Sequence, residues 1–145
     1  MRNSSNDRST RAADPLAPLR GNAMMAHLLG ALESGKDIGH YGRLVFVMIA
    51  HHFLDDDQIV AQLTKNDRFS ETEARALCLN VRSKGYSPPK REKILQFQSQ
   101  QEFPICPTDD PDACNVYRDL RFPQEVYEHI QEYYEQKAEA SESSA

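Results

Sequence analysis

The chain has 145 residues, 39% of them hydrophobic, with a net charge of −5 and a mean hydropathy of −0.68, which suits one small polar domain. It holds no run of about 18 apolar residues and begins without an apolar stretch, so we expect neither a membrane span nor a secretory signal. Three cysteines are too few for a disulfide framework, which favours a reducing, cytoplasmic location.

The first part of the chain predicts an arm followed by two helices. Residues 1–21 are rich in polar and charged side chains, and we expect them to be disordered. An apolar stripe over residues 23–32 predicts the first helix. Residues 38–54 are nearly continuous in apolar side chains, which predicts a central helix buried on most sides.

Capping signals mark the next two helices. Three consecutive aspartates that begin at Asp55 favour a helix start. They could also bind a divalent cation, but the cap is the simpler interpretation. Ser70 and Glu73 form a capping-box pattern, and the helix that they open is expected to run to about Lys84 and to end at Gly85.

Prolines divide the rest of the chain. We expect a short helix over residues 90–98 and a long ordered loop over 99–122 with room for one helical turn. Pro123 can open the last helix at its first turn. No strand pattern occurs, so the predicted fold is all-α, a single compact domain of about six helices over 22–136. A disordered acidic tail is expected over 137–145.

The cysteines and histidines give only a weak signal for a metal. Cys106 and Cys114 lie in a proline-rich acidic loop, whereas Cys78 falls on a helical stripe and is expected in the core. A structural metal site needs four ligands, usually as two close pairs. The sequence spacing does not identify any of His40, His51, His52 or His129 as a missing ligand. Adjacent residues such as His51 and His52 rarely chelate together on a helix, so contact with the helix C-terminus is favoured. We expect no metal and no other cofactor.

Basic residues gather at the start of the predicted central helix. Lys36, His40 and Arg43 lie within eight residues of one another, and free N–H groups at a helix N-terminus attract phosphate. An arginine adds a bidentate donor for phosphate oxygens. Solvated charges at a helix start are the simpler alternative, and no phosphate-binding glycine loop or catalytic triad pattern accompanies them.

The order of these motifs resembles the C-terminal domain of the archaeal and eukaryotic DNA primase large subunit. In that family an H-x-x-R pair opens a buried helix, Y-x-P-x-S-C follows, and a loop with two further cysteines precedes a P-x-x-Y stretch. The matching positions here are His40 and Arg43, residues 86–89, Cys106 and Cys114, and residues 123–127. The resemblance covers about residues 20–130, and the order and spacing of the motifs are more specific than any one of them.

Two positions depart from the family pattern. The family domain holds an iron–sulfur cluster on four cysteines, but Met24 and Arg91 stand at the first and second of these positions. Two thiolates cannot hold a [4Fe–4S] cluster in the usual way. The resemblance therefore implies a member that has lost its cluster, is colourless, and is similar to a small non-catalytic third primase subunit. Arg91 could replace packing around the cluster with a salt bridge.

The resemblance also implies a function and partners. Such a domain forms no phosphodiester bonds; it helps the primase catalytic and large subunits to hold the DNA template, the 5′-phosphates of an RNA or DNA primer, and the initiating nucleotide triphosphate. A nucleoid-associated cytoplasmic protein is expected, with no membrane partner. His40 and Arg43 would contact phosphate by position, and further basic residues are candidates from charge alone: Lys36, Arg75, Arg82, Lys84, Lys90 and Arg91.

Two alternatives remain. A helical module that docks on a replication protein without binding nucleic acid is favoured by the net charge of −5 and by the six glutamates from residue 124 onward. An unrelated regulatory helical domain would make the pair His40 and Arg43 irrelevant to priming. Tyr41, Tyr86 or Phe46 could stack on a base, but each is more simply a core residue.

Overall fold

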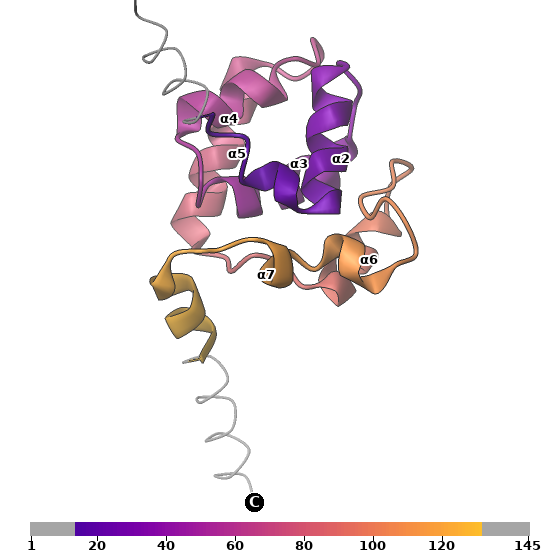
Figure 1. Ribbon diagram of the computed structural model, residues 1–145. Helices are drawn as coiled ribbons and strands as arrows, with labels where there is room; N and C mark the ends of the chain where they lie inside the picture. The colour runs from indigo at the N-terminus through magenta and orange to yellow at the C-terminus, as the bar shows by residue number, and fades with distance from the viewer. Residues whose placement is uncertain (1–13, 132–145) are drawn as a thin grey trace, which may run out of the picture.

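The fold is that of a computed structural model, which describes residues 14–131 (Figure 1). This part of the chain is helical and has no strand, which confirms the predicted all-α class. Residues 124–131 are also helical. The other elements are η1 (Leu19–Gly21), α2 (Ala23–Glu33), α3 (Gly39–Ala50), α4 (Asp56–Leu63), α5 (Glu71–Lys84), α6 (Arg91–Gln98), η2 (Pro111–Cys114) and α7 (Val116–Asp119).

Helix α3 is the centre of the core, as its apolar sequence predicts. Residues 45–50 are all buried, and Phe46 is the largest side chain that is fully enclosed. Helices α2, α4, α5 and α6 all pack against α3, so this helix meets a neighbour on most sides. Stacking of Phe46 on a nucleic-acid base is excluded by this burial, and its role is to fill the core.

The central helix is shorter than predicted. It ends at Ala50, and residues 51–54 form turns instead of a fourth helical turn. The cause is the next helix: Asp55 is the N-cap of α4 and has an extended backbone, with ψ at 172°. An N-cap residue takes non-helical angles, so α3 cannot run directly into α4.

The predicted helix start at Asp55 and the predicted capping box at Ser70 are both present, and Asp55 also forms a capping box. The Asp55 carboxylate accepts from Gln58 N–H, and the Gln58 side chain accepts from Asp55 N–H. Ser70 and Glu73 do the same for α5. Gly85 then ends α5 in the left-handed region, with φ at 62°. These local signals set both helix starts and one helix end where the sequence placed them.

The folded chain begins earlier than predicted. Leu19 is fully buried, and η1 packs against α2, so the expected disordered arm over residues 1–21 is too long; its first thirteen residues lie outside the described part, as does the tail over 137–145. Asn22 explains the early start. Its side chain caps α2 by accepting from Met25 N–H at 3.0 Å and donates to Asp119 Oδ2 at 2.9 Å.

Residues 85–131 form a layer beneath the group of helices α2 to α5 (Figure 1). The predicted loop over 99–122 contains two short helical segments, η2 and α7, where the sequence indicated one turn. The layer is held by α6, which packs against α3, by η2, which packs against α2, and by Val126, which is buried on the last described helical segment. Within residues 14–131, none of the helices has the length and apolarity needed to cross a membrane.

Candidate nucleic-acid interface

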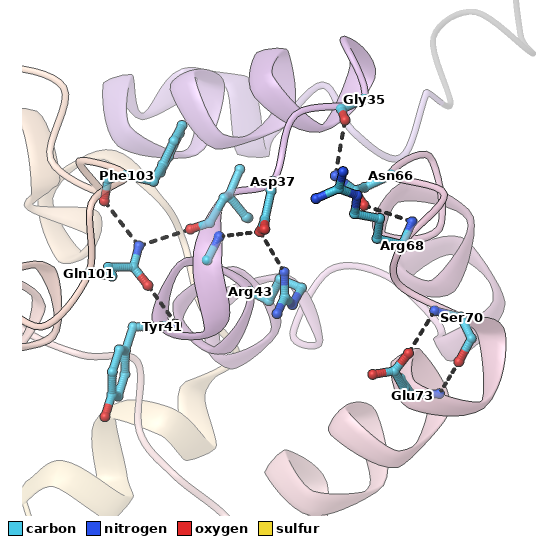
Figure 2. Close-up of polar contacts among 12 residues, drawn as sticks. Gly35, Asp37, Tyr41, Arg43, Asn66, Arg68, Ser70, Glu73, Gln101 and Phe103 are labelled. Atoms are coloured by element: carbon cyan, nitrogen blue, oxygen red, sulfur yellow. Dashed lines mark hydrogen bonds and ion pairs between the residues drawn. The ribbon is translucent and has the colours of Figure 1, made fainter.

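The start of α3 holds three of the predicted phosphate ligands, and Arg43 is the least accessible (Figure 2). Its guanidinium donates to Asp37 Oδ1 at 2.9 Å and lies 4.3 Å from the centre of the Phe69 ring. The side chain is 18% exposed. The Gly39 amide, assisted by Arg43, holds the pKa of Asp37 below its ordinary value. Arg43 therefore joins α3 to the loop before α5 and to the turn before α3.

The backbone amides at this helix start are also occupied. Gly39 N–H donates to Asp37 Oδ1 at 2.8 Å, and Tyr41 N–H donates to Gln101 Oε1 at 2.9 Å. The Gln101 side chain in turn donates to the carbonyls of Ile38 and Phe103 (Figure 2). Only glycine fits at position 39, because φ is 81° there and a Cβ would overlap the Gln101 amide. These contacts leave fewer amides for an anion than the sequence suggested.

Lys36 and His40 are the two members of the group that face solvent. The His40 ring packs edge-on against the Tyr41 ring, with 5.1 Å between centroids. Tyr41 stacks on Phe97 at 5.1 Å and donates from its hydroxyl to Gln100 at 3.1 Å. Tyr41 thus anchors α3 to α6.

The two arginines of α5 are paired with carboxylates. Arg75 donates to Asp57 and to Glu71, both at 2.9 Å. Arg82 contacts Asp56 at 2.7 Å and also donates to the Leu54 carbonyl in the turn before α4. These pairs join α5 to the start of α4. Their positive charge is offset locally, so a phosphate gains less from them than from an unpaired arginine.

The basic residues Lys90 and Arg91 lie at the start of α6, beside a cavity of about 350 Å³. Lys90 is the N-cap, but no side chain caps the amides of this helix. Lys84, at the end of α5, is exposed six residues earlier. Two acidic residues, Glu92 and Asp112, share the cavity wall. The cavity combines basic side chains and open helix amides, with nearby carboxylates as the opposing charge.

The cysteine loop lies against the same cavity. Cys106 Sγ and Cys114 Sγ are 2.7 Å apart, both residues are buried, and Cys114 lines the cavity. Burial, with the Cys114 hydrogen bond next, raises the pKa of Cys106 to about 12, and the nearby Arg91 charge opposes this rise. η2, which ends at Cys114, packs against both α6 and α2. Cys78 is buried on α5, as predicted.

His51 and His52 do not make the charged contact with a helix C-terminus that the sequence suggested. Burial lowers the pKa of His51 to about 4 and lowers that of His52, because desolvation disfavours the charged ring. Their Nε2 atoms are buried without a hydrogen-bond partner. The two rings line a cavity of about 170 Å³ together with Tyr86 and His129. The apolar run before His51 was the signal that this end of α3 would be buried.

The predicted phosphate ligands therefore fall into three groups. One lies at the start of α3, one pairs with the start of α4, and one flanks the start of α6. Within residues 14–131, no three His, Cys, Asp or Glu side chains come together as a metal site. No known family, curated protein or solved structure matches this chain.

Proposed function

We propose that the protein is a non-catalytic accessory subunit of a DNA primase, which helps the primase hold the template, the 5′-phosphates of the primer and the initiating nucleotide. One observation carries the proposal. Arg91 and Cys114 line one cavity, Cys106 lies against Cys114, and α2, which carries Met24, packs on η2 beside them. In the primase large-subunit domain that the sequence resembles, four cysteines hold a cluster from these positions.

These segments lie far apart in the sequence, so their contact in the fold supports the proposal. Met24 and Cys114 are ninety positions apart, yet their segments are in contact. Met24 is fully buried, so a thioether fills space where the related domain has a ligand. None of the ion pairs among residues 14–131 includes Arg91, so the expected replacement of the cluster by a salt bridge is not seen there.

Phosphate contacts are assigned first to the start of α6. Lys90 and Arg91 flank the cavity, and the open amides of an eight-residue helix point the same way. Lys36 and His40 are a second exposed group at the start of α3. Three other candidates are already paired with carboxylates: Arg43, Arg75 and Arg82. They bind phosphate only if its oxygens replace those carboxylates. In this account they stabilise the fold and contribute less to binding.

The test is a fluorescence anisotropy titration of a short primer–template with a 5′-triphosphate, compared with the same duplex ending in a 5′-hydroxyl. We expect the triphosphate to tighten binding and Arg91→Gln to weaken it roughly tenfold. Arg20→Gln is the matched control, because Arg20 is exposed, pairs with Glu33 at 3.4 Å and does not line the cavity. The salt dependence of binding should become shallower by about one counterion in Arg91→Gln only.

An acidic residue in the cavity wall provides a second test, in which binding is expected to become tighter instead of weaker. Glu92→Gln removes a negative charge next to the proposed phosphate site, so it should tighten triphosphate binding and leave the 5′-hydroxyl duplex almost unchanged. Failure of both duplexes to bind at low salt would exclude the nucleic-acid role of the isolated chain.

A docking module without nucleic-acid binding is the second candidate. Leu79, on the outer face of α5, is 68% exposed, the highest value among large apolar side chains of the described residues. Exposed apolar side chains mark interaction surfaces when they cluster. This function predicts a complex with a purified primase subunit on gel filtration that persists at high salt and is lost in Leu79→Ser, with no binding to either duplex.

A further inference from the structure

The loop over residues 106–114 brings its two cysteine sulfurs together. Cys106 Sγ lies 2.7 Å from Cys114 Sγ, and both residues are free thiols with almost no exposed surface. A disulfide bond joins sulfurs at about 2.05 Å, so a small movement of the loop is enough to form one. The third cysteine, Cys78, is buried on α5 and makes no such contact among the described residues.

The backbone of the loop is already fixed in the shape that the sulfur contact needs. Cys106 N–H donates to Gln98 Oε1 at 2.7 Å, which fastens one end of the loop to α6. Asp110 N–H donates to Thr108 Oγ1 at 3.2 Å, and Asp112 N–H donates to Asp110 Oδ1 at 3.0 Å. Little further chain entropy is lost when the two sulfurs are joined, because the loop is ordered before the bond forms.

We propose that Cys106 and Cys114 form a reversible disulfide that fixes η2 beside the start of α6. The oxidant is a small-molecule disulfide of the glutathione type. The Cys114 thiolate attacks one of its sulfurs, forms a mixed disulfide and releases one small thiol, which takes the proton from Cys114. Cys106 then attacks the Cys114 sulfur and releases the second small thiol, which takes the proton from Cys106. Two electrons pass from the cysteines to the oxidant, whose sulfur–sulfur bond is broken.

The cavity beside α6 explains the order of the two steps. Cys114 lines the cavity and Cys106 does not, so in this proposal a small disulfide approaches Cys114 from the cavity side. Arg91 lies on the same wall, and its charge opposes the rise in the pKa of Cys106 that burial causes. Burial and the contact with Cys114 keep Cys106 protonated until the mixed disulfide has formed. Both thiols are nearly enclosed, so the reaction is slow and selective for small reagents.

The disulfide would make the position of η2, at the wall of the cavity, depend on the redox state of the two cysteines. η2 packs against α2 and α6, and the bond would hold it there at the end of the loop. The oxidised protein should therefore unfold at a higher temperature, because a cross-link removes freedom from the unfolded chain. This inference does not depend on the primase proposal, since it concerns only the thiols and the loop that carries them.

The experiment equilibrates the full-length protein in a series of reduced and oxidised glutathione mixtures that contain a metal chelator. The samples are quenched with acid, denatured, alkylated, digested with trypsin and examined by mass spectrometry. Trypsin releases both cysteines in one peptide over residues 94–118, because no Lys or Arg lies between Lys93 and Arg118. We expect this peptide to change from doubly alkylated to unalkylated and lighter by two hydrogen atoms, while Cys78 remains alkylated.

Variants keep the test interpretable. Cys78→Ala should leave the transition unchanged, and Cys114→Ser should abolish it. If Cys114→Ser fails to fold, the wild-type protein still decides, because its melting temperature must be higher at the oxidised end and return on reduction. A peptide that stays doubly alkylated at the oxidised end, or one that stops at a stable mixed disulfide with glutathione, would overturn the proposal. So would protection from alkylation that only appears when the chelator is omitted, because that indicates a shared metal ion.

Discussion

At the scale of single residues, Arg43 is held more firmly than an arginine on the surface. Its guanidinium pairs with Asp37 and lies over the Phe69 ring. We predict that Arg43→Ala lowers the free energy of unfolding by about 1–2 kcal/mol, because it removes a partly enclosed cation–π contact and the pair with Asp37. Urea denaturation followed by circular dichroism measures this change.

The control for this prediction is Arg20→Ala. Arg20 is exposed and pairs with Glu33 at 3.4 Å, and exposed pairs contribute about 0–1 kcal/mol. Equal effects of the two variants would show that the contacts of Arg43 do not matter for stability. In that case Arg43 could exchange the Asp37 carboxylate for a phosphate oxygen with little loss of stability. It would then again be a leading candidate for binding phosphate.

The pair His51 and His52 predicts how stability depends on pH. Burial lowers the pKa of His51 from 6.5 to about 4, so between these values the unfolded chain binds a proton that the folded chain does not. Stability should therefore fall as the pH is lowered from 6.5 towards 4 and should be flat just above 6.5. Urea midpoints at pH 7 and pH 5 test this, and replacement of both histidines by Gln should reduce the slope.

At the scale of elements, the two capping boxes make a simple prediction. Ser70→Ala removes the acceptor for Glu73 N–H at the start of α5 and should lower stability by about 1 kcal/mol. Thr72→Ala, two positions later on an exposed site of the same helix turn, should change it by less than about 0.5 kcal/mol. Denaturation midpoints of the two variants give the comparison, and a neutral Ser70→Ala would mean that tertiary packing alone fixes the start of α5.

The helices with local signals were the ones that the sequence predicted well. Asp55, Ser70 and Gly85 act within one turn of their own helix, so their patterns are visible along the chain. The contacts that shape the candidate site are of another kind. Gln101 reaches Tyr41 N–H across sixty positions, and Asn22 reaches Asp119 across ninety-seven. No periodic pattern in the sequence predicts a contact between segments so far apart. Such contacts decide which helix amides remain available to a ligand.

At the scale of the whole molecule, the eight predicted phosphate ligands do not form one surface. The pairing of Arg43 with Asp37 is local, because the acidic residue stands six positions earlier, just before the same helix. The pairing of Arg75 with Asp57 is not local, because it joins two helices. Charge counting therefore identified the basic residues, but not which of them lie beside a cavity. Cavities lie beside all three groups, but the cavity at the start of α6 is lined by two basic side chains, Lys90 and Arg91, and the amides of that helix are not capped by its N-cap side chain.

The most direct measurement of the central claim is primer synthesis by purified primase catalytic and large subunits on a single-stranded template, with increasing amounts of this chain. The account predicts a saturable rise in the rate of primer initiation. It also predicts that Arg91→Gln needs more protein for the same rise, while Arg20→Gln matches the wild type. An initiation rate that stays the same at every concentration of folded chain would contradict the account, and the docking function would then be the one to pursue.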